Sequence, residues 1–427
     1  MQIPALYEKF LDSSGISTDT RKIEEGKIFF ALKGENFNGN LFAHQALDKG
    51  AKLIVADEKH FADHDHILIV DDVLNTLQML ANHHRQQLSL KVIAIGGSNG
   101  KTTTKELISQ VLGCAFKTFA TKGNLNNHIG VPLTLLSIPV ETEIAIIEMG
   151  ANHIGETALL CTIVQPDFGL VTNNGKDHIE GYGTIEGVRK GNGELYDFLR
   201  NNNGIAFVCA DQSDLMESST DIKRITYGQH ERADCRGKIA ERFPFLEVEW
   251  MNENVVLTSN LIGQYNFDNM MAAVAVGHFF EVSPEMIREA IASYLPSNNR
   301  SQILKQGSNT FILDAYNANP SSMMAALENF RLMPVDNKIV ILGDMLELGK
   351  VSSEEHKQIV EVVMKENFKK AIFVGEEFGN VLSGTFDEAL HFNTVTALKD
   401  WFDQQHFSGY TFLLKGSRRI GLEKLVL

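Results

Sequence analysis

Short apolar runs separated by amphipathic stretches and polar turns make up the pattern of this sequence. The clearest run, residues 92–95, is rich in β-branched side chains and predicts a buried strand. A glycine-rich turn follows it, and apolar residues then recur at helical spacing through residues 103–112. A strand, a glycine-rich turn and a helix in this order place backbone N–H groups around an anion. The pattern therefore predicts a phosphate-binding unit.

Apolar runs of the same kind continue downstream. Residues 144–147, 168–172 and 205–210 are predicted to be buried strands of a parallel, doubly wound sheet. Residues 246–261 alternate between apolar and polar side chains, as an antiparallel ribbon does, and residues 266–280 have the pattern of a helix.

Both ends of the chain also mix predicted strands with helices. Before residue 89, a small α/β domain is predicted, with strands at 27–32, 52–56 and 66–70 and helices at 42–49 and 72–87. After a linker near residues 296–300, strands and helices alternate, which implies a parallel, Rossmann-like sheet with right-handed crossovers. Its predicted strands are 310–313, 338–342, 370–374 and 410–414, and its predicted helices are 321–330, 353–364 and 395–402. The predicted domains are 1–88, 89–296 and 297–427, the second of them like a P-loop ATPase.

Composition narrows the class of protein. The 427 residues are 44% hydrophobic and 22% charged, which is ordinary for a globular protein. A net charge of −15 argues against a nucleic-acid binder with a broad basic face. Because no export signal or membrane-spanning run is evident, we expect a cytoplasmic protein. Widely spaced cysteines predict reduced core thiols rather than a zinc site: Cys114, Cys161, Cys209 and Cys235.

The turn after residues 92–95 has the chemistry of a triphosphate site. Gly96 is followed by three residues and then by Gly100-Lys101-Thr102, one residue fewer than in the common phosphate loop. Lys101 would reach the terminal phosphates, and the Thr102 hydroxyl would bind Mg²⁺. The residues expected around the nucleotide are Gly97, Ser98, Asn99, Gly100, Lys101, Thr102 and Thr103.

Polar side chains follow the predicted strands, and ligands of doubly wound sheets bind beyond the carboxyl ends of strands. Glu148 directly follows one apolar run, where it could supply an oxygen to Mg²⁺, and His178 follows the next. Asp314 and Asp344 end strands of the last region and are further candidates for ligand contact. From the pattern alone, Glu148 could also be a solvated carboxylate and His178 a packed histidine.

Three loops are unusually polar. Residues 17–21 and 34–39 are rich in hydrogen-bonding groups, and their sequence alone favours ordinary turn chemistry. Residues 121–132 form a loop with an unusual number of asparagines.

In combination these motifs resemble the Mur ligases, the amide-bond-forming enzymes of peptidoglycan precursor synthesis. Residues 96–104 are similar to the phosphate loop of that family, including its short glycine spacing. Residues 123–132 resemble a loop that distinguishes the family members that add a dipeptide. Other similar blocks are residues 148–152, 177–180, 314–320 and 343–349, and, in the first domain, 19–21 and 29–39.

This resemblance implies a reaction. It implies that the chain joins D-alanyl-D-alanine to UDP-N-acetylmuramoyl-tripeptide with ATP and Mg²⁺, through an acyl phosphate. Lys101, Glu148 and His178 would be catalytic, with Thr102 and Glu148 on one magnesium ion and His178 on a second. A monomer that binds no nucleic acid and does not enter a membrane is expected.

The resemblance also implies substrate contacts. Asn269 would contact the adenine of ATP, Arg300 a phosphate and Asp314 the ribose. The residues expected at the UDP end of the other substrate are Asp19, Thr20, Arg21, Gly34, Asn38, Gly39, Asn126 and Asn127.

One position departs from the family pattern. Mur ligases carry a lysine, carbamylated to an acidic metal ligand, just before a Gly-Glu pair, but here Asn192 precedes Gly193-Glu194. Lys190 is only two residues away, but that step carries it nearly to the opposite side of a helix. Either Asn192 contacts the second metal site through its neutral oxygen or a water, or the register of the helix shifts.

Other functions have weaker support. A ligase that adds the third amino acid, or a folylpolyglutamate synthase, fits residues 123–132 and 314–320 less well. A nucleotide-driven switch or transport ATPase would hydrolyse ATP without a UDP-sugar peptide. A non-catalytic binding module has only Asn192 in its favour.

Overall fold

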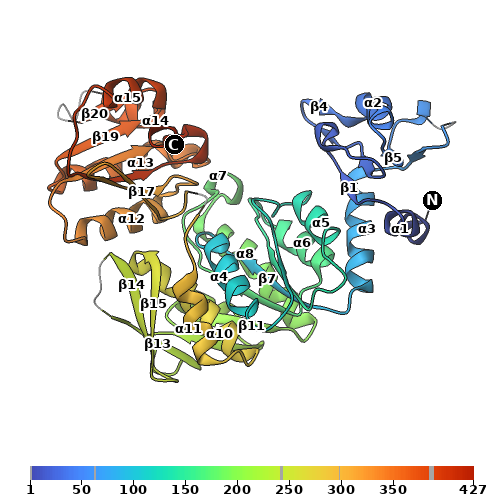
Figure 1. The fold of residues 1–427 in the computed structure, drawn as a ribbon, viewed down its shortest axis with the longest axis horizontal. Coiled ribbons are helices and arrows are strands. Elements are labelled where there is room, and N and C mark those ends of the chain that lie inside the picture. The colour runs from blue at the N-terminus through green and yellow to red at the C-terminus, as the bar shows by residue number, and fades with distance from the viewer. Residues whose placement is uncertain (1, 62–63, 241–243, 298, 384–388) are drawn as a thin grey trace.

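The chain folds into an α/β structure around three large β-sheets (Figure 1). The computed structural model describes residues 2–61, 64–240, 244–297, 299–383 and 389–427. The N-terminal and C-terminal sheets lie apart from each other, and the central sheet connects to both of them (Figure 1).

The N-terminal sheet has four parallel strands in the order β1-β2-β5-β6, so this region is α/β as predicted. Its longest helix, α3, begins after Asp72, whose side chain accepts a hydrogen bond from the Asn75 N–H (2.8 Å). The elements are α1 (Ile3–Leu11), β1 (Ile16–Ser17), β2 (Ile28–Phe30), β3 (Lys33–Gly34), β4 (Phe37–Asn38), α2 (Ala43–Asp48), β5 (Leu53–Ala56), β6 (Ile67–Ile69) and α3 (Val73–Gln87).

The central sheet has nine strands in the order β15-β14-β13-β12-β11-β10-β7-β9-β8. β7 to β13 pair in parallel, and β13, β14 and β15 form an antiparallel ribbon. The pattern predicted the fully buried strands but not β8, β12 and β13, because their partly exposed residues form no apolar run. The strands are β7 (Lys91–Gly96), β8 (Thr118–Ala120), β9 (Ile144–Glu148), β10 (Phe168–Val171), β11 (Ile205–Cys209), β12 (Lys223–Gly228), β13 (Cys235–Ala240), β14 (Phe245–Trp250) and β15 (Val255–Ile262).

Helices cover the central sheet. The helix after the glycine-rich turn, α4, buries Leu107, Ile108, Val111 and Leu112 and packs against α10. The helices are α4 (Lys101–Leu112), α5 (Gly130–Leu135), α6 (Glu156–Val164), α7 (Ile179–Tyr182), α8 (Ile185–Asn201), α9 (Ser213–Ser218), α10 (Phe267–Phe279) and α11 (Pro284–Ser293).

The C-terminal sheet has six strands in the order β16-β17-β21-β18-β19-β20, and one of them departs from the predicted parallel sheet. β16 pairs antiparallel with β17 through a tight turn at Gly307 (φ +60°). Its partly exposed residues form no apolar run, so the pattern did not reveal it. The elements are β16 (Gln302–Gln306), β17 (Asn309–Asp314), α12 (Pro320–Leu332), β18 (Lys338–Gly343), α13 (Ser352–Lys365), β19 (Lys370–Val374), α14 (Glu376–Leu382), β20 (Leu390–Phe392), α15 (Val395–Phe402) and β21 (Thr411–Lys415).

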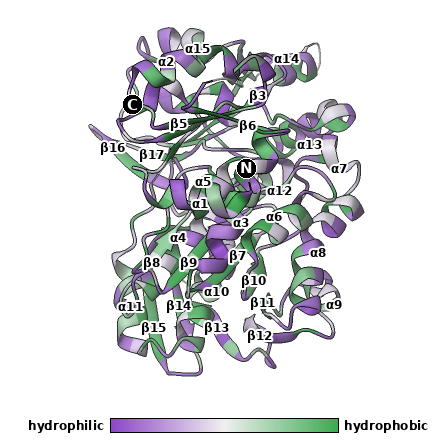
Figure 2. Ribbon diagram, turned by 90° about the vertical axis from the view of Figure 1, so that its right-hand side faces the viewer, coloured by the Kyte–Doolittle hydropathy of each residue, from purple (hydrophilic) through white to green (hydrophobic). Residues whose placement is uncertain are grey.

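Hydrophobic strands form the inside of each layer, with more polar helices outside (Figure 2). One continuous core joins the N-terminal and central regions, because Leu77 and Leu80 of α3 belong to the same cluster as Val92 of β7. Cys161, Cys209 and Cys235 are buried, but Cys114 is exposed and is not the core thiol that was predicted. Among the described residues, no helix is long and apolar enough to cross a membrane.

Candidate active site

A pocket of about 740 Å³ lies where the central region meets the C-terminal region. Its central wall comes from the turn after β7, the end of β9, the segment after β10 and the start of α10. Its C-terminal wall includes residues 314–319, which follow β17. The carboxyl ends of parallel strands therefore open into it, as expected for a doubly wound sheet.

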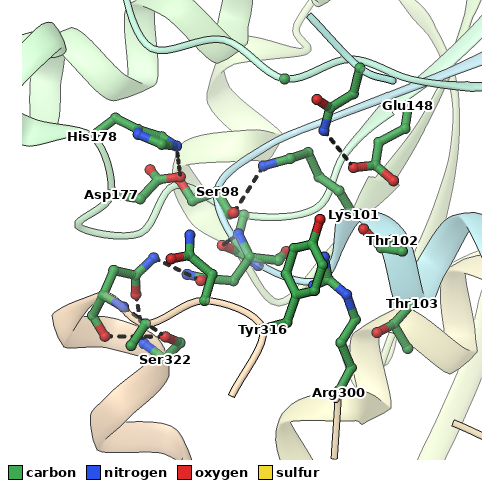
Figure 3. A pocket seen from close by; sticks show the side chains of 18 of the residues that line it. Ser98, Lys101, Thr102, Thr103, Glu148, Asp177, His178, Arg300, Tyr316 and Ser322 are labelled. Atoms are coloured by element: carbon green, nitrogen blue, oxygen red, sulfur yellow. Dashed lines mark hydrogen bonds and ion pairs between the residues drawn. The ribbon is translucent and has the colours of Figure 1, made fainter. Parts of the chain in front are cut away.

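The glycine-rich turn has the backbone geometry of an anion site. Gly97 (φ +111°) and Gly100 (φ +84°) have positive φ, and α4 begins directly after Gly100. Ser98 N–H donates to the Asn173 carbonyl (2.9 Å), which fixes the turn against the segment after β10. The Lys101 ammonium folds back to donate to the carbonyls of Gly97 and Ser98 (3.0 Å for Ser98) (Figure 3). The turn thus presents a helix N-terminus and a cation together.

Glu148 ends β9 with a nearly fully buried carboxylate. Its Oε1 accepts a hydrogen bond from Asn126 Nδ2 (2.8 Å). Its Oε2 lies 3.6 Å from the buried ammonium of Lys105, which is within ion-pair distance but too long for a hydrogen bond. Lys105 itself donates to the Thr121 carbonyl (2.8 Å). Glu148 is therefore a positioned carboxylate, and one of its oxygens has no hydrogen-bond donor.

His178 lies between two carboxylates from different regions. Its Nδ1 is 2.6 Å from Glu347 Oε2 of the C-terminal region, and its Nε2 is 4.0 Å from Asp177 Oδ2. The hydrogen bond with His178 holds the pKa of Glu347 below its usual range. The contact between His178 and Glu347 was not predicted, because the two residues are 169 positions apart in the sequence and belong to different regions.

The donor atoms in this pocket suit a hard divalent cation such as Mg²⁺, which prefers oxygen ligands. Within the described residues, the buried oxygens Glu148 Oε2 and Asp177 Oδ1 have no hydrogen-bond partner. Both side chains line the pocket together with Thr102 (Figure 3). Lys105 already lies near Glu148 Oε2, whereas no lysine or arginine pairs with Asp177 within the described residues. The two carboxylates and the Thr102 hydroxyl are oxygen ligands of the kind that Mg²⁺ binds, so the residues present fit a bound cation.

The C-terminal wall supplies an aromatic ring and cations. The Arg300 guanidinium lies 3.8 Å from the centre of the Tyr316 ring, and that of Arg418 lies 5.1 Å from it. The buried Lys415 ammonium pairs with Asp314 Oδ2 (2.7 Å), and Ser301 N–H donates to Asp314 Oδ1 (3.3 Å). Asp314 is therefore held rigidly at the edge of the pocket.

Most of the predicted nucleotide and metal residues meet in this pocket. Gly97 does not line the pocket, but its carbonyl accepts a hydrogen bond from the Lys101 ammonium. Asn269 packs against Gly100, and its Oδ1 accepts from the Thr104 hydroxyl (3.0 Å). The predicted residues that line the pocket are Ser98, Asn99, Gly100, Lys101, Thr102, Thr103, Asn126, Asn127, Glu148, His178, Asn269, Arg300 and Asp314.

Other predicted residues lie elsewhere or have local partners. Asn127 Oδ1 accepts hydrogen bonds from the Ile129 and Gly130 N–H groups just before and at the start of α5. Asp344 does not line this pocket; its carboxylate accepts the Glu377 and Phe378 N–H groups at the start of α14 (3.0 Å each). The predicted UDP residues of the N-terminal region also lie outside this pocket: Asp19, Thr20, Arg21, Gly34, Asn38 and Gly39.

Asn192 and Lys190 lie in different environments on α8. Asn192 is buried on α8, whereas Lys190 is exposed on that helix. The Asn192 Nδ2 donates to Asn174 Oδ1 (2.8 Å), and neither Asn192 nor Asn174 lines the pocket. In this structure Asn192 thus supports the segment after β10 rather than facing the pocket.

Sequence reasoning missed several pocket or supporting residues. Lys105 and Lys415 are buried. Lysines are seldom buried without a charged partner, and the spacing of residues in the sequence did not predict the burial of these two. Asp177 and Glu347 were within blocks that were recognised, but neither was given a role. Tyr316 likewise lies in the recognised block of residues 314–320.

The fold and the pocket together define a nucleotide-binding α/β enzyme built around a phosphate loop. Three family models match the chain in succession: the Mur ligase catalytic domain at residues 12–85, the Mur ligase middle domain at 95–277 and the Mur ligase glutamate ligase domain at 299–418. The chain belongs to the Mur ligase family.

Individual relatives are more specific than the family models. UDP-N-acetylmuramoyl-tripeptide–D-alanyl-D-alanine ligase of Bacillus subtilis is 33% identical over 96% of this chain and 92% of that protein. The crystal structure I of MurF from Acinetobacter baumannii has a TM-score of 0.87 at 29% identity, over 98% of this chain and 97% of that one. The structure of the Thermotoga maritima MurF ligase in complex with ADP has a TM-score of 0.87 at 26% identity, over the same shares.

Proposed function

We propose that this chain joins D-alanyl-D-alanine to UDP-N-acetylmuramoyl-tripeptide with ATP, giving the UDP-pentapeptide of peptidoglycan synthesis, ADP and phosphate. The observation that carries the proposal is the single pocket in which the phosphate loop, Glu148 and His178 face Arg300 and Asp314. The name of the Bacillus subtilis relative states this activity. The Thermotoga maritima relative, whose overall structure is similar to that of this chain, was solved in complex with ADP.

The reaction requires activation, because a carboxylate is a poor electrophile at neutral pH. The terminal phosphate of ATP moves to an oxygen of the tripeptide carboxylate, the bond from phosphorus to the bridging oxygen breaks, and ADP leaves. The dipeptide amine then attacks the acyl carbon and loses a proton, and the C–O bond to phosphate breaks as the amide forms. Positioning and charge stabilisation are the main tasks of the protein in such transfers.

The central region supplies those functions. Lys101 releases its contacts with the Gly97 and Ser98 carbonyls and binds the terminal phosphates. A magnesium ion held by Thr102 and Glu148 would neutralise charge that develops on the phosphates, and His178 would hold a second. Asn269 would contact the adenine.

The C-terminal wall would complete the ATP site. Arg300, which now stacks on Tyr316, would contact a phosphate, and Asp314 would bind the ribose. Lys415 and Ser301 hold the Asp314 carboxylate in place for that role.

The N-terminal region is proposed to bind the UDP end of the tripeptide substrate. Asp19 and Arg21 form an exposed bidentate pair, and the Arg21 hydrogen bonds lower the pKa of Asp19 to about 2. Gly39 lies so close to the Ala31 and Leu32 backbone that a Cβ there would be 2.7 Å from the Ala31 carbonyl carbon. These contacts fix the conformation of the two loops that contain residues 19–21 and 34–39. The remaining residues proposed for this site are Thr20, Gly34, Asn38, Asn126 and Asn127.

We place the domains at residues 1–88, 89–296 and 297–427. The three matched family domains fall within these limits, which supports them. A cytoplasmic location and a monomeric state remain predictions.

The test measures phosphate release from ATP and Mg²⁺ with UDP-N-acetylmuramoyl-tripeptide, with and without D-alanyl-D-alanine. We expect release to require the dipeptide and to yield a UDP-pentapeptide by mass spectrometry. Lys101→Met should lower the rate by about 10²-fold or more, since it removes a phosphate contact, whereas Lys190→Met, at an exposed lysine outside the pocket, should not. Phosphate release that ignores the dipeptide would instead support an ATPase.

A further inference from the structure

The carboxylate of Asp177 is a buried charge without a matching donor. Its side chain is only 9% exposed, and it lines the pocket beside the phosphate loop. Among the described residues, Asp177 Oδ1 has no hydrogen-bond partner and Asp177 forms no ion pair with a lysine or arginine. A buried carboxylate that no lysine or arginine neutralises is unfavourable, so this geometry favours a bound cation beside Asp177.

The neighbouring histidine is arranged as a metal ligand. Glu347 occupies Nδ1 of His178 at 2.6 Å, which leaves Nε2 for a ligand. That nitrogen lies 4.0 Å from Asp177 Oδ2. Metal-binding histidines commonly donate their second ring N–H to a carboxylate in this way.

The location suits a cation that also contacts phosphate. The segment that carries Asp177 is fastened to the phosphate loop, since Asn99 N–H donates to Asn173 Oδ1 (3.1 Å) and Ser98 N–H to the Asn173 carbonyl. Figure 3 shows the Asp177 carboxylate between the His178 ring and Ser98 in that view. Asn192 does not compete for this position, because its amide contacts Asn174 outside the pocket.

We propose that Asp177 supplies an anionic oxygen to the second divalent-cation site, the one already proposed at His178, with His178 Nε2 as the nitrogen ligand. The site is distinct from the one at Thr102 and Glu148. An oxygen and an imidazole nitrogen are ligands that Mg²⁺ or Mn²⁺ accepts. This inference rests on the proposed nucleotide site.

The test counts Mn²⁺ ions bound per chain by electron paramagnetic resonance in the presence of ADP, with Mn²⁺ as the probe. Asp177→Asn keeps the shape of the side chain and removes its charge, so we expect one bound Mn²⁺ fewer, or an affinity at one site weakened by at least about tenfold. Glu156→Gln is the matched control, since Glu156 lines the same pocket but already accepts the Asn152 and His153 N–H groups. Its Mn²⁺ count should equal that of the wild type.

A second readout separates binding from folding. Without metal, Asp177→Asn and Asp177→Ala should melt at or above the wild-type temperature, because each removes a buried charge that no lysine or arginine neutralises. With ADP and Mn²⁺, both should gain less thermal stability than the wild type.

Unchanged Mn²⁺ binding in both variants would overturn the proposal. Loss of an ion in Asn192→Ala, but not in Asp177→Asn, would assign the ligand to Asn192 instead. The ion count needs no turnover, so a failure of the proposed ligase reaction would be seen separately, as absence of the UDP-pentapeptide.

Discussion

At the scale of single residues, the pocket depends on buried charges that hold one another in place. Lys105 and Glu148 are 3% and 2% exposed, and the two form a pair at 3.6 Å. Lys415 and Asp314 repeat the arrangement on the opposite wall. In each pair, the lysine positions the carboxylate that is proposed to meet a ligand.

Removal of Lys105 should therefore destabilise the fold as well as the site. We expect Lys105→Met to lower the free energy of unfolding by about 3–5 kcal/mol, because it leaves the Glu148 carboxylate buried without its cation. The double variant Lys105→Met/Glu148→Gln should lose less than the sum of the single losses. Urea unfolding of the wild type, both single variants and the double variant measures this coupling. Strictly additive losses would show that the pair does not interact.

At the scale of elements, the two adjacent glycines that open the phosphate loop differ in whether the backbone requires glycine. A Cβ on Gly97 would lie 2.7 Å from the Thr172 backbone nitrogen, and its φ of +111° is unfavourable for other residues. Gly96 has no such restriction, since the nearest atom to a Cβ there is a Leu195 methyl carbon at 3.8 Å.

This difference gives a matched pair of substitutions. Gly97→Ala should push the loop away from β10 and weaken ADP binding at least about tenfold, which corresponds to a loss of about 1.4 kcal/mol. Gly96→Ala should bind ADP as the wild type does, because the added methyl group finds room. Isothermal titration of both variants with ADP and Mg²⁺ tests the prediction, and equal affinities would contradict it.

A second element-scale prediction concerns the packing of α1 on α3. The Tyr7 hydroxyl lies 3.1 Å from His84 Nδ1, and burial, together with the nearby His83, lowers the pKa of His84. As pH falls below the ordinary histidine pKa of about 6.5, the unfolded chain takes up a proton before the folded one does. Stability should therefore decrease as pH falls from about 7 towards the lower, folded-state pKa.

The variant His84→Gln lacks this titration. Its melting temperature should fall less than that of the wild type between pH 7 and pH 5.5, because the other histidines titrate in both proteins. Differential scanning calorimetry at the two pH values gives the comparison. Equal falls in melting temperature would refute a role for His84.

Sequence reasoning succeeded where an element is buried on all sides or has a rigid local geometry. The strands β7, β9, β10 and β11 were predicted because burial on both faces requires continuous apolar runs. The phosphate loop was predicted because its glycines and lysine all lie within residues 96–101. Strand β16 was missed because an edge strand needs no apolar run. The contact between Glu347 and His178 was missed because only tertiary folding brings these two residues together.

At the scale of the whole molecule, polar contacts join the central and C-terminal regions, and some of them lie at the pocket. Asn319 Nδ2 donates to Asn99 Oδ1 (2.8 Å), and Lys176 pairs with Glu355 (2.7 Å). Glu347 pairs with His178, and its carbonyl accepts the Glu180 N–H (3.4 Å). Both His178 (φ +47°) and Glu347 (φ +64°) have left-handed backbone conformations that are uncommon outside glycine.

The Glu347 contact should therefore couple the approach of the two regions to the orientation of His178. We expect Glu347→Gln to enlarge the radius of gyration measured by small-angle scattering with ADP and Mn²⁺, and to weaken Mn²⁺ binding.

Glu355→Gln removes another ion pair between the same regions, but its partner Lys176 is half exposed, and such pairs contribute only about 0–1 kcal/mol. This control should match the wild type in both measurements. If the two variants expand equally while Mn²⁺ binding is unchanged, any charge between the regions serves equally well and Glu347 does not orient His178. If Glu347→Gln alone changes both measurements, closure of the molecule and assembly of the cation site are one event, and water is excluded from the acyl phosphate only when the metal ligands are in place.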